Sequence, residues 1–93
     1  MSTVDDLTIA FEDDGIELCK EIDKAVLSKG AWATVIFKYQ DWNSSKGEYD
    51  QPKMSLRRYR KIKGQYKQQS KFNISSMKQA RALTSVLQDW TAE

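Results

Sequence analysis

The fold is decided by residues 53–71, which read KMSLRRYRKIKGQYKQQSK. Eight of these nineteen residues are Lys or Arg, two are Tyr and none is acidic. The apolar residues fall on alternate positions, which is the period of an extended strand. The pattern therefore predicts two strands, over residues 53–62 and 66–74, joined by a hairpin turn at Gly64. A flat, positive sheet face that bears aromatic rings suits single-stranded nucleic acid, a polyanion with stackable bases.

Alternation also assigns each side chain of these two strands to a face. In the first strand, one face holds mainly polar and basic residues: Ser55, Arg57, Tyr59, Lys61 and Lys63. The opposite face holds Met54, Leu56 and Ile62, together with Arg58 and Arg60. In the second strand, the polar and basic residues again share a face: Lys67, Gln69, Lys71 and Asn73. Tyr66, Phe72 and Ile74 face the other way, with Gln68 and Ser70. We expect the two polar, basic sets to lie on one solvent-facing side.

Residues 31–42 predict another strand, because they are rich in β-branched and aromatic residues. One of its faces is the candidate core: Ala33, Val35, Phe37 and Tyr39. The other face is predicted to be an exposed platform: Trp32, Thr34, Ile36, Lys38, Gln40 and Trp42. A turn at residues 28–30 precedes this strand, and a loop over residues 43–52 follows it.

A helix is predicted over residues 76–90, with Ser75 or Ser76 as its N-cap. Its apolar residues form one stripe: Met77, Ala80, Leu83, Val86, Leu87 and Trp90. We expect this stripe to cover the apolar face of the sheet.

The segment over residues 16–28 fits two structures. Leu18, Ile22, Ala25 and Val26 have helical spacing, whereas Ile16, Leu18, Ile22 and Val26 also share one face of a strand. Local signals favour the helix slightly. Residues 1–15 are predicted to be an acidic tail with a weak strand near residues 7–11, and residues 16–93 to be the folded domain.

Length and composition limit the class of protein. Ninety-three residues make one domain of modest stability, for which self-association would bury more apolar surface. No apolar run approaches the length of a membrane span, and the first residues lack the pattern of a signal peptide. The single cysteine, Cys19, cannot form an internal disulfide. These features predict an intracellular protein of the cytoplasm or nucleoid, or of the nucleus in a eukaryote.

The net charge of +2 conceals a strong segregation of charge. Residues 1–27 carry eight acids and two bases, residues 28–81 carry thirteen bases and three acids, and residues 82–93 carry two acids. Such charge can serve solubility alone. Its concentration on strands with interleaved rings favours a binding face instead.

The chain lacks the residues of common catalytic sites. It has no histidine, one cysteine and no glycine-rich phosphate-binding motif. The acid pairs Asp5-Asp6 and Asp13-Asp14 are better explained as solvated charge than as catalytic carboxylates. We therefore predict a binding protein that is not an enzyme and uses no cofactor or metal.

Four segments together carry a resemblance to a known family. They are Val26–Gly30, Trp42–Asn43, Leu56–Tyr59 with its aliphatic-Arg-x-aromatic order, and Ser70–Ser76 running into the capped helix. In order and spacing they resemble the positive cofactor 4 family of transcriptional coactivators, which binds single-stranded DNA, and most of all its small bacterial and phage-type members. The resemblance covers roughly residues 18–90.

The resemblance implies an α+β fold: a four-stranded curved antiparallel sheet followed by one C-terminal amphipathic helix. It also implies a homodimer that binds single-stranded DNA, in transcription regulation or DNA metabolism, with transcription or replication proteins as partners. Stacking of bases on aromatic rings would give little sequence preference, because every base has a π face. The acidic tail would either compete with DNA or simply be solvated, and we favour the solvated state.

We assign candidate roles within the predicted interface by chemistry. Phosphate contacts are expected from Arg57, Lys61, Lys63, Lys67 and Lys71. Lys38 and Lys53 complete the basic set. Base stacking is expected from Tyr59, Trp32 and Trp42, although each ring could instead be structural. Gln69 and Asn73 would donate or accept hydrogen bonds.

Three rival functions remain. The same face could bind single-stranded RNA, which offers the same phosphates and rings. A regulator of duplex DNA would need a basic helix, yet residues 76–93 contain only Lys78 and Arg81 as bases. A basic protein-interaction module would meet an acidic partner.

Overall fold

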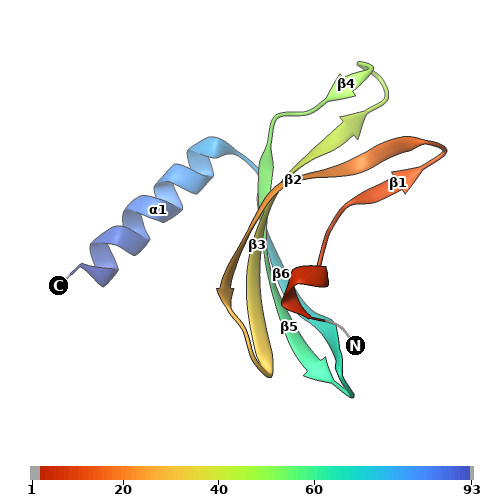
Figure 1. The fold of residues 1–93 in the computed structure, drawn as a ribbon. Helices are drawn as coiled ribbons and strands as arrows, with labels where there is room; N and C mark the ends of the chain where they lie inside the picture. The colour runs from red at the N-terminus through yellow and green to blue at the C-terminus, as the bar shows by residue number, and fades with distance from the viewer. Residues whose placement is uncertain (1–2, 93) are drawn as a thin grey trace.

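The structure, a computed structural model, describes residues 3–92 and belongs to the α+β class (Figure 1). It consists of one curled antiparallel sheet and a C-terminal helix. The elements are η1 (Val4–Asp6), β1 (Phe11–Asp13), β2 (Ile16–Ser28), β3 (Trp32–Asn43), β4 (Glu48–Tyr49), β5 (Lys53–Ile62), β6 (Gln65–Ile74) and α1 (Met77–Thr91). The curved antiparallel sheet and the closing helix were predicted correctly, but the prediction of four strands was wrong. The sheet has six strands, in the order β1-β2-β3-β5-β6, with β4 paired to β3.

The slight local preference for a helix over residues 16–28 was also wrong, because β2 is a strand. It pairs with β3 from Cys19 opposite Asp41 to Ser28 opposite Thr34. The register shifts between Glu21 and Asp23 and again between Val26 and Ser28. Each shift inserts an extra residue and breaks the two-residue alternation. The apolar residues of a strand with two such irregularities can therefore show helix-like spacing.

Two short strands extend the sheet beyond the four that were expected. β1 forms a hairpin with β2 through Asp14 and Gly15, which both have positive φ. β4 lies inside the predicted loop and pairs with the end of β3. Residues 3–15 are therefore structured and joined to the sheet, and only part of this region is a strand.

The strand registers define two faces of the sheet. Val35 lies opposite Arg57 and Phe37 opposite Ser55, whereas Ile36 lies opposite Leu56. Directly paired residues point to the same side of a sheet. We call the side of Val35 and Phe37 the strap face, because residues 3–10, the strap, lie on it. We call the side of Ile36 the helix face. Figure 1 shows η1 on one side of the sheet and α1 projecting on the other.

Ile74, which pairs with Met54, is buried on the helix face, but the main buried cluster lies on the strap face. Val35 and Phe37 are completely buried there. The strap supplies Val4 and Ile9, which are 9% and 8% exposed, and the half-buried Leu7. The other residues of the cluster all belong to the sheet: Ala33, Val35, Phe37, Tyr39 and Tyr59, with Cys19 and Tyr66 at its margin. The buried centre of this small domain is thus a sandwich of one short segment against a curved sheet.

Helix α1 begins after Ser76, whose hydroxyl oxygen accepts a hydrogen bond from the Gln79 amide at 3.1 Å. The prediction of a capped helix is confirmed. Its apolar stripe, however, does not cover the sheet of its own chain. Leu83, Leu87 and Trp90 are all exposed, Trp90 by 79%. The helix meets the sheet only near its first turn, beside β6, and then leads away from it (Figure 1).

Candidate nucleic-acid interface

The β5–β6 hairpin carries most of the positive charge of the chain. Lys63 and Gly64 form its turn, with φ of 52° and 79°. Two successive positive φ values are typical of the tight turns that match the twist of a hairpin. The hairpin thereby holds its cationic side chains in two rows, one on each face: Lys53, Arg57, Lys61 and Lys71 on the strap face, and Arg58, Arg60 and Lys67 on the helix face.

A chain of hydrogen bonds fixes the polar side chains on the strap face. The buried Ser55 hydroxyl donates to Asn73 Oδ1 at 2.8 Å. Arg57 Nε donates to Ser55 Oγ at 3.1 Å, and its Nη1 donates to Gln68 Oε1 at 3.1 Å. These contacts engage Arg57 with neutral partners, so its charge is not neutralised. A cation held in one position in this way loses little conformational freedom when it binds an anion.

A bulge in β6 divides the predicted basic set. Arg58 pairs with Ser70 and Tyr59 pairs with Gln68, which leaves Gln69 as the extra residue. On the C-terminal side of Gln69, Lys71 and Asn73 lie on the strap face, as expected. On its N-terminal side, Lys67 pairs with Arg60 on the helix face. The prediction that Lys67 shares a side with Lys71 was therefore wrong, because one extra residue reverses the alternation.

Tyr59 lies in the core and not on an open platform. Its side is the predicted one, with Arg57, but the ring is only 5% exposed beneath the strap. Burial is the main reason that the pKa of the Tyr59 hydroxyl is raised. The expectation of a solvent-facing ring was wrong, since the strap was taken to be a solvated tail. Nearby, the Tyr66 hydroxyl donates to the Gly30 carbonyl at 2.6 Å and ties β6 to the β2–β3 turn.

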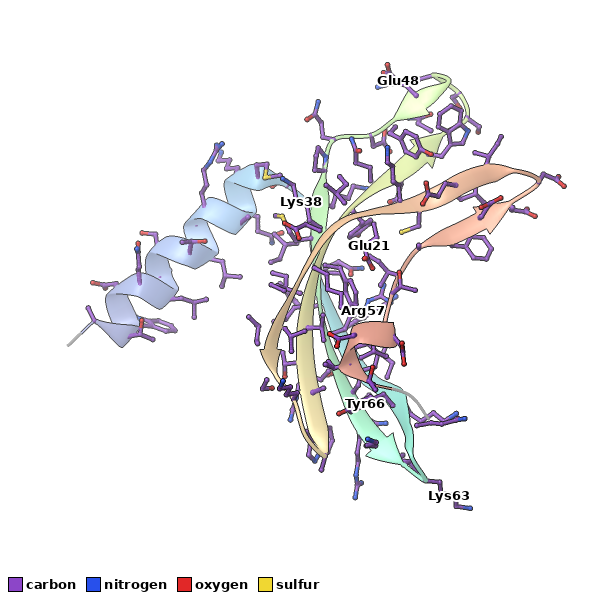
Figure 2. The ribbon with its side chains drawn as sticks, in the orientation of Figure 1. Glu21, Lys38, Glu48, Arg57, Lys63 and Tyr66 are labelled. Carbon is purple, nitrogen blue, oxygen red and sulfur yellow. The ribbon has the colours of Figure 1, made fainter. Side chains whose placement is uncertain are left out.

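Trp32 and Lys38 lie on the opposite face from Arg57 and Tyr59. Trp32 pairs with Arg60, and Lys38 pairs with Met54. Figure 2 shows Lys38 on the side of α1, and Arg57 with Glu21 on the side of η1. The Trp32 ring is 42% exposed and lies 4.6 Å from the guanidinium carbon of Arg58. The predicted interface therefore mixed residues from both faces.

The remaining predicted residues lie at the two ends of the sheet. Lys63 is at the exposed hairpin tip. Trp42 is at the far end of β3 from Trp32, about 33 Å away by strand rise. Its ring packs edge-on against Tyr49, with the two ring centroids 5.1 Å apart. Lys53 forms an ion pair with Asp41 at 3.4 Å. This is the one ion pair within the described residues 3–92.

Sequence reasoning missed three groups of residues at this surface. Arg58 and Arg60 both lie over the Trp32 ring, and the guanidinium carbon of Arg60 is 5.6 Å from the ring centroid. Ser55 and Gln68 hold Arg57. Lys24 projects from β2 to the strap. Alternation places Arg58 and Arg60 on the same side as Trp32 only once the β3–β5 register is known, and no local sequence signal gives that register.

Other kinds of site find no support in the part of the chain described. Residues 3–92 contain no group of three His, Cys, Asp or Glu side chains arranged to hold a metal ion. Among the same residues, no helix has the length and apolar character needed to cross a membrane.

Comparison with known proteins gives no relative. No family model, no curated protein and no solved structure matches this chain.

Proposed function

We propose that this protein binds single-stranded nucleic acid, DNA in the first place, on the strap-face side of the β5–β6 hairpin. The observation that carries the proposal is a basic hairpin that contains no acidic residue. Residues 51–88 contain no Asp or Glu. Of the eight cations in the hairpin, only Lys53 has a carboxylate partner among the described residues. Such a surface attracts phosphates and releases their counterions on binding.

The proposed contacts follow from the geometry of this face. Arg57, held by Ser55 and Gln68, would bind one phosphate through its guanidinium group. Lys61 and Lys71 would bind neighbouring phosphates, and Lys63 would extend the row at the tip. Asn73 would hydrogen-bond sugars or base edges. Trp32, Lys38 and Lys67 lie on the other face and are outside this proposed interface.

The proposal includes a homodimer formed through α1. The apolar stripe of the helix is exposed, and the apolar residues of the helix face are covered only in part: Phe72 is 55% exposed, and Ile36 and Leu56 are half-buried. A second copy that packs its stripe and helix face against the first would bury both surfaces in one symmetric contact. With the curved sheet, the C-terminal helix and the basic hairpin as its support, the proposal also includes membership of the positive cofactor 4 family and a role in transcription regulation or DNA metabolism.

A binding assay separates this function from its rivals. Labelled oligo-dT, oligo-rU and duplex DNA of equal length are titrated at two salt concentrations. We expect oligo-dT to bind most tightly, with an affinity that falls steeply with salt. Stronger binding to oligo-rU would indicate an RNA-binding protein, and equal binding to duplex would indicate a duplex regulator. No binding to any of the three would overturn the proposal and favour an acidic protein partner.

A further inference from the structure

The strap covers the most aromatic part of the strap face. Val4 and Ile9 pack in one cluster with the β3 rings Phe37 and Tyr39 and with Tyr59 of β5. These three rings come from two directly paired strands, since Ala33 lies opposite Tyr59 and Phe37 opposite Ser55. Beside them, on the same face, lie the cations of the proposed interface. The strap therefore borders the row of Arg57 and Lys61 and hides the rings next to it.

The strap is held by few polar contacts. Lys24 Nζ donates to the Asp5 carbonyl at 3.0 Å and to the Leu7 carbonyl at 2.7 Å. The Thr8 hydroxyl donates to Glu21 Oε1 at 2.7 Å. The backbone of residues 3–10 forms no strand, so no ladder of main-chain hydrogen bonds fixes it to the sheet. Beyond these three hydrogen bonds, its attachment rests on Val4, Ile9 and the half-buried Leu7. Release of the strap would therefore break no hydrogen bond of the sheet ladder.

The strap covers the kinds of group that a single strand of nucleic acid would contact. Apolar side chains sit on rings that could stack bases, and two carbonyl oxygens sit on an ammonium group that could bind a phosphate. We propose that the nucleic-acid site continues beneath the strap, with Phe37, Tyr39 and Tyr59 as stacking rings and Lys24 as a further phosphate ligand. Single-stranded nucleic acid displaces residues 3–10 to reach this hidden part. The inference rests on the proposed function and extends its site.

A covered site has a definite consequence for affinity. The apparent Kd equals the intrinsic Kd divided by the fraction of molecules in which the strap is open. The two acids Asp5 and Asp6 lie on the strap and are exposed, so a closed strap also adds negative charge at the edge of the basic row. Opening removes both obstacles at once. Weakening the strap should therefore tighten binding, the opposite of what loss of an ordinary core segment would do.

Amide hydrogen exchange of the wild-type protein, with and without oligo-dT, tests the inference directly. In the free protein the Asp6 and Leu7 amides donate within the strap, to the Thr3 and Val4 carbonyls. We expect the exchange of residues 3–10 to accelerate on binding, while β5 and β6 become more protected. Unchanged or slower exchange in residues 3–10 would overturn the inference, even though oligo-dT binds.

A strap variant gives an independent test. The double substitution Val4→Ser and Ile9→Ser should lower the apparent Kd for oligo-dT about ten-fold or more. Phe11→Ser is the matched control, because it removes a large apolar side chain that is 59% exposed and lies outside the strap. Circular dichroism checks that the sheet persists. Faster thiol modification at Cys19, which packs beside the cluster, checks that the strap has opened.

The outcomes separate the two proposals. Tighter binding by the folded strap variant, with no change for Phe11→Ser, supports the hidden site. Unchanged or weaker binding by a folded variant overturns it and leaves the proposed function standing. If the variant unfolds, the exchange experiment on the wild-type protein decides. Failure of both wild type and folded variant to bind oligo-dT overturns the proposed function and the hidden site together.

Discussion

The two faces of this sheet carry similar residues but are used differently. Each has rings and cations, such as Tyr59 with Arg57 on the strap face and Trp32 with Arg58 on the helix face. On the strap face the rings are buried under residues 3–10, and Tyr59 is 5% exposed. On the helix face Trp32 is 42% exposed, and the apolar stripe of α1 is uncovered. One face is thus closed by its own chain, and the other is open to a partner.

The difference shows that composition does not determine what a sheet face does. A short segment with two or three apolar side chains is enough to turn an aromatic platform into a core. Helix α1 has the opposite effect: its apolar stripe does not pack on the sheet of its own chain, so a large apolar surface stays exposed. If the strap face is covered and the helix face is exposed, four experiments should give different results for the two faces. They are given from the largest expected effect to the smallest.

The largest effect is expected on the helix. Leu87→Glu places a charge in the middle of the exposed stripe of α1, which we propose to be the dimer contact. It should weaken self-association by about 3 kcal/mol or more, roughly a hundred-fold in Kd. Sedimentation equilibrium measures the mass, which should fall from twice the chain mass to 10.8 kDa.

Ser85→Glu is the control for this experiment, since Ser85 is exposed on the opposite side of the same helix. It should leave the mass unchanged. A wild-type protein that already sediments as a monomer would contradict the proposed dimer, and the stripe would then need another partner.

The second prediction compares one ring from each face. Tyr59→Ala removes a buried ring and should reduce the free energy of unfolding by about 3 kcal/mol or more. Trp32→Ala removes a half-exposed ring and should reduce it by about 1 kcal/mol or less. Urea denaturation of both variants gives the two values. Equal losses would show that the faces are equally buried in solution, for example because a partner covers Trp32.

The elements of the fold were largely predictable from the sequence, but their relations were not. Alternation and composition gave β3, β5 and β6, and the capping serine with its apolar stripe gave α1. These are local patterns, carried by neighbouring residues. β2 was obscured by its two irregularities, and β1 and β4 were too short to be distinguished from tail and loop.

The site was predicted less well, because a shared face depends on register. Arg57, Lys61, Lys71 and Asn73 do lie together. Trp32 and Lys38 were added to them because the face of β3 predicted to be exposed was assumed to lie on the same side of the sheet as the basic face of β5. The observed register pairs Phe37 with Ser55. Trp32 and Lys38 therefore lie on the side of the sheet opposite to the basic face of β5. The strap was missed for a related reason, since nothing local indicates where three apolar residues in an acidic segment will pack.

The third prediction tests which face binds nucleic acid. Lys61 and Lys67 are both exposed near the hairpin tip but point to opposite sides, since Lys61 pairs with Tyr66 and Arg60 pairs with Lys67. Lys61→Ala should reduce the slope of log affinity against log salt by about one. Lys67→Ala is the matched control and should leave the slope nearly unchanged. Equal reductions would mean that the nucleic acid wraps around the tip and contacts both faces.

The smallest effect concerns the start of the strap at low pH. Hydrogen bonds from Thr3 to the Asp6 carboxylate, from the amide at 3.0 Å and the hydroxyl at 3.2 Å, lower the pKa of Asp6. The positive charge of Lys24 adds a smaller effect in the same direction. A lowered pKa in the folded state means that this contact stabilises the strap above the ordinary pKa of about 3.9. The stabilisation is lost as the pH falls through the lowered value.

Acid should therefore loosen η1 before it unfolds the sheet. Carbon NMR titration of the Asp6 carboxyl measures its pKa, and Thr3→Ala should raise that pKa only part of the way, because the Thr3 amide still donates. Asp6→Asn should remove the acid-dependent step in the exchange of strap amides without changing that of β5. If the strap amides of Asp6→Asn still respond to acid in the same range, another carboxylate controls the strap, and Glu21, which accepts from Thr8, is the first to replace.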